Sequence, residues 1–95
     1  MFDHLYEVSE QANVTFVGWA TEQIRYDFAL IYSDHFIGKT LVVCMQTGRS
    51  TLLCADDLRP EILQVKFNLP HAEAASEAAQ LLLTRIHPLE VQDQY

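Results

Sequence analysis

Hydrophobic and polar residues alternate along the first half of the chain in a way typical of β-strands. Residues 24–33 give the clearest pattern, since every second residue from Ile24 onward is apolar. Residues 13–20 are rich in β-branched and aromatic side chains, which favours another strand before them. Residues 39–46 and 49–55 predict two further strands after short turns. Because parallel neighbours would need long crossovers, these strands predict an antiparallel meander.

The second half of the chain predicts an elbow, a further strand and a helix. An Asp cap followed by Pro favours a short helical elbow between Asp56 and Pro60. Residues 63–69 alternate again and read as a fifth strand. Residues 70–86 are strong helix formers, with Pro70 well suited to a first helical position. The predicted fold is α+β: a four- to five-stranded antiparallel meander sheet, a short elbow and one carboxy-terminal helix packed on one face.

Length and composition fit one folded domain. The chain has 95 residues, of which 49% are apolar and 20% charged, as in ordinary globular domains. We expect a single domain over residues 1–95, with an ordered core over about residues 5–87 and a frayed tail at 88–95.

The charge pattern excludes several classes of partner. The net charge is −7, and the 6 basic residues are scattered along the chain. Binding to nucleic acid or to anionic lipid needs clustered Lys and Arg, so we predict neither. The sequence also has no signal peptide and no apolar run of about 20 residues, which predicts a cytoplasmic protein that does not enter a membrane.

Apolar residues occupy both faces of the predicted sheet. Val17, Trp19 and Ile31 are opposite in phase to neighbours that are also apolar, such as Phe16 and Phe28. One helix cannot cover two faces, and an antiparallel sheet normally keeps one polar, solvated face. The spare face is covered by coiling of the sheet, by the amino-terminal segment that contains Phe2, Leu5, Tyr6 and Val8, or by a second copy. We favour a homodimer, with Val17, Trp19 and Ile31 in its interface.

The predicted helix carries a second apolar strip besides its core stripe. The core stripe is expected to contain Ala72, Ala75, Ala79, Leu82, Leu83 and Ile86. Ala74, Ala78 and Leu81 lie apart from it on the helical wheel. These three residues either reflect helix propensity alone or form part of a partner surface.

The two cysteines, Cys44 and Cys54, flank a predicted hairpin turn and are expected to be free, buried thiols. If the loop has two residues, Thr47 faces Ser50 and the sulfurs lie on opposite sides of the sheet. A three-residue loop would instead place the two cysteines directly opposite each other.

Few side chains match a pattern of known chemistry. The sequence has no phosphate-binding glycine loop and no Gly-x-Ser-x-Gly, HExxH or CxxC motif. No histidine has a second ligand at metal-binding spacing, since Asp3-His4 and Asp34-His35 are adjacent pairs that point apart on a strand. We therefore predict no metal, no cofactor and no catalytic residue, and lean against an enzyme. One charged cluster, Arg25, Asp27, Arg49 and Asp57, is a candidate for binding a small anion or a peptide terminus. The alternative is a structural Arg–Asp pair, with Asp57 as a cap.

Several short motifs, taken in order and spacing, resemble a known family. They are Phe16-Val17-Gly18, Arg25-Tyr26-Asp27, Phe36-Ile37-Gly38-Lys39-Thr40-Leu41-Val42, Gln46-Thr47-Gly48-Arg49 and Asp56-Asp57-Leu58. The chain resembles, over about residues 5–85, short cytosolic proteins of Gram-positive, Bacillus-type bacteria that are classed as a domain of unknown function. Trp19 and Cys44 stand where other apolar residues are expected. The resemblance implies one small cytosolic domain and no particular activity.

Two functional hypotheses follow from the sequence. The first is a non-enzymatic, homodimeric interaction module, suggested by the two apolar sheet faces; a different protein partner would use the same surface. The second is a small-ligand site built on the charged cluster.

Overall fold

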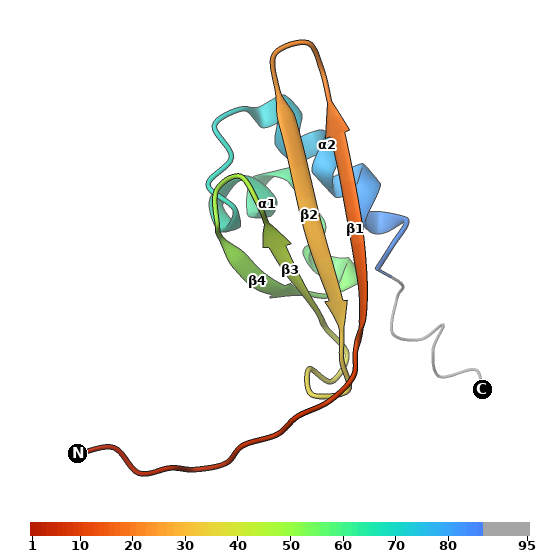
Figure 1. Cartoon of the computed structure of the whole chain (residues 1–95). Coiled ribbons are helices and arrows are strands. Elements are labelled where there is room, and N and C mark those ends of the chain that lie inside the picture. The colour runs from red at the N-terminus through yellow and green to blue at the C-terminus, as the bar shows by residue number, and fades with distance from the viewer. Residues whose placement is uncertain (87–95) are drawn as a thin grey trace.

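The computed structural model describes residues 1–86 and consists of one sheet with helices packed on it (Figure 1). Its elements are β1 (Asn13–Ala20), β2 (Arg25–Tyr32), β3 (Thr40–Cys44), β4 (Ser50–Leu53), the 3-10 helix η1 (Ala55–Asp57), α1 (Pro60–Lys66) and α2 (Ala72–Leu83). The strands form an antiparallel sheet in the order β1-β2-β3-β4, which confirms the α+β meander. The expected frayed tail at residues 88–95 lies outside the described residues. None of the helices within residues 1–86 has the length and hydropathy of a membrane span.

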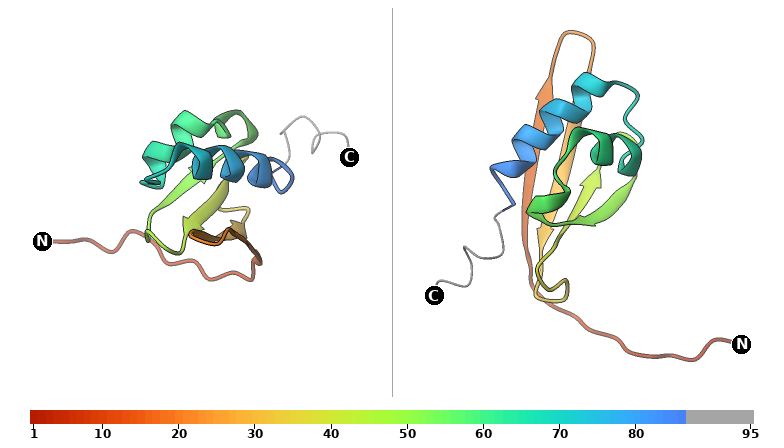
Figure 2. Two further views of the ribbon diagram at one scale, coloured as in Figure 1. Left: turned by 90° about the horizontal axis from the view of Figure 1, so that it is seen from above. Right: turned by 180° about the vertical axis from the view of Figure 1, so that it is seen from behind.

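Both α-helices cover the same face of the sheet. Viewed from above, α1 and α2 lie on one side of the sheet, and the first residues of the chain lie on the other (Figure 2). The core between sheet and helices includes Phe28 from β2 and Phe67 from the end of α1, whose rings meet edge to face at 5.2 Å. The Tyr32 hydroxyl donates a hydrogen bond to the Arg85 carbonyl at 3.1 Å, which ties β2 to the end of α2.

The prediction of a fifth strand at residues 63–69 is wrong, because residues 63–66 belong to α1 and Phe67 is its C-cap. Pro60 takes the first helical turn, where its missing N–H costs nothing, and Lys66 lies in the last turn near the negative end of the helix dipole. Leu63 and Phe67, one helical turn apart, are both fully buried, whereas Val65 between them is 75% exposed. A strand would have placed all three on the same side.

A residue in the left-handed backbone conformation ends α1 and turns the chain toward α2. Asn68 has φ of 54°, and its N–H donates to the Val65 carbonyl at 3.3 Å. The next N–H, from Leu69, reaches back to the Gln64 carbonyl at 2.9 Å. This pair of bonds is a Schellman motif, which satisfies the last carbonyls of the helix. The second helix then begins at Ala72, two residues later than predicted.

The register of the β1–β2 hairpin corrects the predicted positions of Val17 and Trp19. Its loop contains four residues, Thr21–Ile24, and the Thr21 hydroxyl oxygen accepts hydrogen bonds from two of their backbone N–H groups. Trp19 therefore pairs with Tyr26, and Val17 pairs with Phe28. Since paired residues share a face, both lie on the core side, where the Trp19 ring stacks on Phe28 at 5.4 Å. Their predicted place on the spare face is wrong.

The predicted second strip on α2 is not a free surface. Ala74 and Ala78 are buried in the core, because α2 lies beside α1 as well as over the sheet. Alanine is small enough for two helices to pack closely at these positions. Leu81 is half-buried, and Leu83, which was expected in the core stripe, is exposed. The prediction that Ala74 and Ala78 face a partner is therefore wrong.

The β3–β4 turn is longer than the predicted two-residue loop. Cys44 lies opposite Arg49: its N–H donates to the Arg49 carbonyl, and its own carbonyl accepts from Gly48, each at 2.8 Å. Gly48 has φ of 74°, a conformation that glycine adopts at low cost. Cys44 is a buried free thiol and Cys54 a half-buried one.

Candidate functional site

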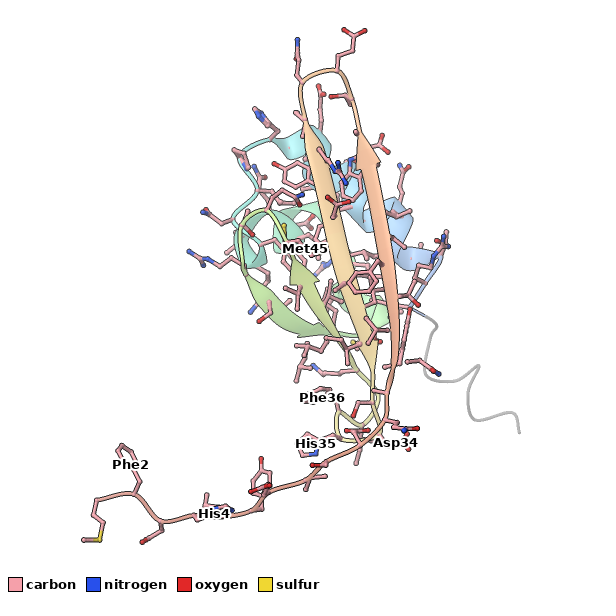
Figure 3. The ribbon with its side chains drawn as sticks, viewed as in Figure 1. Phe2, His4, Asp34, His35, Phe36 and Met45 are labelled. Atoms are coloured by element: carbon pink, nitrogen blue, oxygen red, sulfur yellow. The ribbon has the colours of Figure 1, made fainter. Side chains whose placement is uncertain are left out.

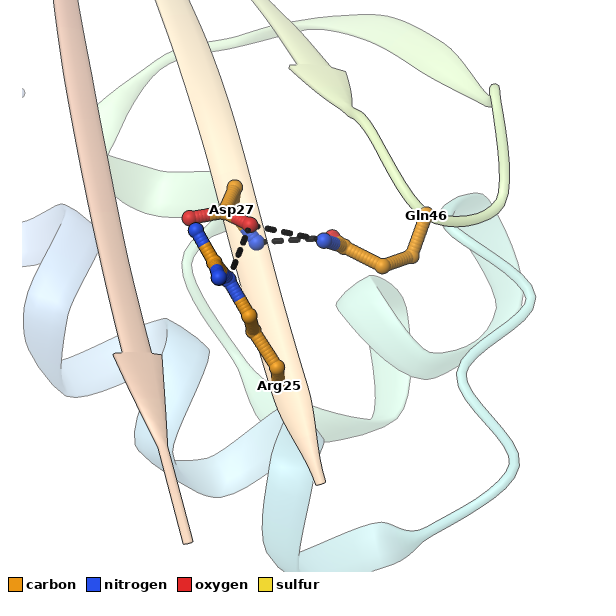
Figure 4. Close-up of polar contacts among 3 residues, drawn as sticks. All are labelled: Arg25, Asp27 and Gln46. Atoms are coloured by element: carbon orange, nitrogen blue, oxygen red, sulfur yellow. Dashed lines mark hydrogen bonds and ion pairs between the residues drawn. The ribbon is translucent and has the colours of Figure 1, made fainter. Parts of the chain in front are cut away.

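Two of the four predicted site residues form an ion pair on the face of the sheet opposite the helices (Figure 4). Arg25 Nε lies 3.0 Å from Asp27 Oδ2. The same carboxylate oxygen accepts a hydrogen bond from Gln46 Nε2 at 2.7 Å, and Gln46 Oε1 accepts one from the Asp27 backbone N–H, also at 2.7 Å. These bonds hold the pKa of Asp27 below its usual value, with Gln46 the larger cause and Arg25 the second. We call Arg25, Asp27 and Gln46 the polar triad.

A glycine makes room for the polar triad. Gly18 pairs with Asp27 across β1 and β2, and a Cβ built at residue 18 would lie 2.3 Å from Asp27 Oδ1. The carboxylate therefore lies over a backbone position that no larger residue could occupy without displacing it.

The other two predicted site residues lie elsewhere. Asp57 closes η1, and its Oδ2 accepts hydrogen bonds from the Cys54 backbone N–H at 3.0 Å and from the Cys54 thiol at 3.3 Å. These bonds lower the pKa of Asp57, as expected for a cap. Within residues 1–86, the Arg49 side chain makes no ion pair. The predicted four-residue cluster therefore does not form.

Gln46 is the member of the triad that the predicted site lacks. The sequence predicts it as the last residue of a strand over 39–46, whereas Gln46 follows β3 at the level of Asp27, where the Met45 N–H still donates to the Asp27 carbonyl at 2.9 Å. Only the register of β2 and β3 could have indicated this contact, and that register is not visible in the sequence.

The face of the sheet that the helices leave uncovered is apolar over one complete row of residues and most of the next. Val14, Ile31, Leu41 and Leu52 are consecutive partners across the four strands. Phe16, Ala29 and Val43 form the next row, which ends at Ser50 on β4. Gly18 and Asp27 belong to a third row, so the polar triad borders the apolar area. We call the seven apolar residues of the two rows the open face.

The open face is uncovered within the described chain. Figure 1 looks onto it, with the helices behind the sheet. Phe16 is 68% exposed, and Val14 and Leu52 are also exposed. A sheet surface with two apolar rows and exposed aromatic area is typical of an interaction site, because solvated sheet faces usually carry polar residues. Ile31 is the one predicted interface residue that lies here.

The first twelve residues form an extended amino-terminal arm. Residues 1–12 contain neither helix nor strand, and all of them are exposed. Figure 3 shows Phe2 and His4 far from the body of the molecule. Near its base, the arm contacts the β2–β3 turn: the Ser33 hydroxyl donates to Glu10 Oε1 at 2.5 Å, and the Tyr6 and His35 rings lie 6.2 Å apart. These contacts fix the base of the arm beside the β2–β3 turn.

A pocket of about 670 Å³ lies at the base of the arm. It is lined by residues 10–13, by the β2–β3 turn and by the end of α2, with Lys39 and Arg85 as its cations. It does not include Arg25 or Asp27, which lie near the other end of β2. Among residues 1–86, no three His, Cys, Asp or Glu side chains are grouped to hold a metal ion.

Comparison with known proteins places this arrangement in one family. No curated protein matches the chain. The model of the SAV0927-like family matches residues 5–83, a span that runs from the arm to the end of α2 and includes the open face and the polar triad. Since this match covers most of the chain, the protein belongs to the SAV0927-like family.

Proposed function

We propose that this protein is a non-enzymatic interaction module that works as a homodimer joined through its open face. The observation that carries the proposal is the placement of both α-helices on one face of the sheet, which leaves two apolar rows on the other. We further propose that the module acts in the cytosol of a Gram-positive bacterium.

A second copy is favoured as the partner because the open face is complementary to itself. In a dimer with a two-fold axis, the same patch contributes from both copies, so an apolar surface meets an apolar surface. Phe16, on the edge strand β1, is the most exposed residue of the open face, and aromatic residues often dominate interfaces. Burial of such a side chain removes a large apolar surface from water.

A pair of matched variants tests this proposal. Phe16→Lys places a charge on the open face, and Val65→Lys places the same charge on α1, at a residue that is also exposed. Both variants should fold, because neither side chain belongs to the core. Sedimentation equilibrium of the full chain should show a dimer for the unchanged protein and Val65→Lys, and at least about tenfold weaker association for Phe16→Lys.

Two results would contradict the proposal. One is an unchanged protein that sediments at 10.9 kDa at every concentration up to the millimolar range. The other is equal association of the two lysine variants, since that would place the contact away from the open face.

The alternative of a small-ligand site at Arg25, Asp27, Arg49 and Asp57 has less support. Asp27 is already held by Arg25 and Gln46, Asp57 caps η1, and the pocket lies elsewhere. A titration with inorganic phosphate that shifted the amide signals of Arg25 and Arg49 together would revive it.

A further inference from the structure

We infer that, in the dimer, the amino-terminal arm of each copy lies in extended form across the open face of the other copy. This inference rests on the proposed function and names the segment that completes the interface. It starts from two apolar surfaces of one chain, the arm and the open face, neither of which is covered by the described residues.

The open face alone is too small for a stable dimer. Two rows across four strands cover roughly 250 Å², given strand spacings of about 4.8 Å and residue spacings of about 3.3 Å. A stable interface buries about 800 Å² on each partner. Tyr6 stays on His35 of its own copy, so Phe2 is the aromatic residue that the arm brings to the other copy. Phe2 would add roughly 150–250 Å², the area that a buried aromatic side chain removes from water. With the arm, the interface moves toward the required size.

The sequence of the arm suits an extended chain with one apolar side. In an extended backbone, every second side chain points the same way, so Phe2, Tyr6 and Val8 share a side, together with His4. The opposite side carries the acidic Asp3 and Glu7, with Met1 and Leu5 as its apolar residues, and Glu10 at the base of the arm is the one acidic residue on the first side. The first side fits an apolar sheet surface, and the second fits water.

The anchor of the arm directs it away from its own sheet. The hydrogen bond between Ser33 and Glu10 and the contact between Tyr6 and His35 hold the base of the arm beside the β2–β3 turn. Residues 1–5 then continue away from the body, and Phe2 is fully exposed (Figure 3). To cover its own open face, the chain would have to break both contacts and reverse direction.

Length and position allow the arm to reach a second copy. Residues 1–5, which lie beyond the anchored Tyr6, span about 17 Å when extended, and four strands are about 19 Å wide. The arm also leaves the molecule on the side of the open face (Figure 2). A two-fold axis in front of that face therefore gives each copy the arm of the other, in a closed, reciprocal exchange.

Cross-linking of the full chain tests the inference directly. A benzoylphenylalanine cross-linker replaces Phe2, and chains grown with ¹⁴N and ¹⁵N are mixed, so that peptides that combine both labels identify contacts between copies. We expect mixed-label cross-links from residue 2 to Val14, Phe16, Ile31 or Leu41. Cross-links found only within one label would overturn the inference.

Two further variants test which side of the arm makes the contact. Phe2→Ser should weaken dimerisation by about tenfold, whereas Leu5→Ser, on the opposite side, should leave it within about twofold. Both residues are exposed in the monomer, so neither variant threatens folding. Equal dimerisation affinity of the two variants would overturn the inference that the arm binds the other copy in extended form. If Phe2→Ser and Leu5→Ser dimerise equally well but Phe16→Lys still weakens dimerisation, the proposed dimer stands without the arm exchange. An unchanged protein that is monomeric would contradict both the dimer and the arm exchange.

Discussion

At the scale of single residues, the polar triad sets the limit of the open face. Gly18 leaves space for the Asp27 carboxylate, and Gln46 and Arg25 hold that carboxylate in place. Asp27 contributes a charge directly beside two apolar rows, which marks where the sheet surface changes from apolar to polar. The position of this border therefore depends on the lack of a side chain at Gly18 as well as on the side chains of the polar triad.

Gly18→Ala should therefore raise the pKa of Asp27 toward its usual value. The new Cβ would lie 2.3 Å from Asp27 Oδ1, so the carboxylate must move and lose its bonds to Gln46 and Arg25. NMR titration of the Asp27 carboxyl carbon measures this pKa. An unchanged pKa would contradict the prediction.

The same substitution should change how stability depends on pH. Because the folded-state pKa of Asp27 is lowered, its bonds stabilise the fold above the unfolded pKa of about 3.9, and this contribution is lost as pH falls through the folded value. The unchanged protein should lose more stability on acidification than Gly18→Ala, as measured by urea unfolding at a series of pH values.

At the scale of elements, the strands could be predicted from alternation, but their register and the nature of α1 could not. The period-two pattern located β2 to within one residue at each end. A loop of four residues between β1 and β2 nevertheless placed Val17 and Trp19 on the core face, because a slip of one residue exchanges the two faces. Loop length depends on backbone hydrogen bonds at Thr21, which no pattern of hydrophobic residues encodes.

The error at α1 has a similar cause. Leu63 and Phe67 fit both a strand and a helix, since their spacing of four is a multiple of two and also about one helical turn. Pro60 at the start of α1 and Asn68 just after its end are what distinguish the helix from a strand. Each is a single residue at one end of the element, so neither contributes to the hydrophobic periodicity. Of the candidate site, the Arg25–Asp27 pair could be predicted from strand periodicity, whereas Gln46 required the register.

Asn68 should tolerate glycine and reject a β-branched residue. A left-handed conformation costs most residues about 1–2 kcal/mol, and glycine little. We expect Asn68→Val to lower the free energy of unfolding by about 1–2 kcal/mol and Asn68→Gly to leave it nearly unchanged, by urea denaturation. Equal stability of the two variants would show that the end of α1 does not depend on this conformation.

At the scale of the whole molecule, apolar contact and net charge oppose each other. Each copy carries −7, so two copies that meet at their open faces repel one another at long range. The arm adds to this repulsion, because Asp3 lies beyond the anchored Tyr6 and is carried with the arm to the other copy. Association through apolar surfaces must overcome this charge.

Dimerisation should therefore strengthen when salt is added. At about 0.1 M ionic strength the Debye length is near 10 Å, so repulsion between the copies is largely screened, whereas apolar contact is not. Sedimentation equilibrium at low and at moderate NaCl concentration should give a smaller dissociation constant at the higher concentration. Weaker association in salt would instead indicate that ion pairs hold the copies together.

The position of β1 at the edge of the sheet has a consequence for solubility. Its sequence, Asn13–Ala20, contains no Lys, Arg, Asp, Glu or Pro, and none of the described residues forms a strand on its outer side. Natural sheets usually protect such an edge with charged residues, proline or a covering segment, since an unprotected edge invites further strands and leads to aggregation. In this protein the edge strand has no such protection, and the net negative charge of −7 instead opposes edge-to-edge association through repulsion between copies. Near the isoelectric point, pI about 4.8, that repulsion disappears, and the chain should be least soluble there.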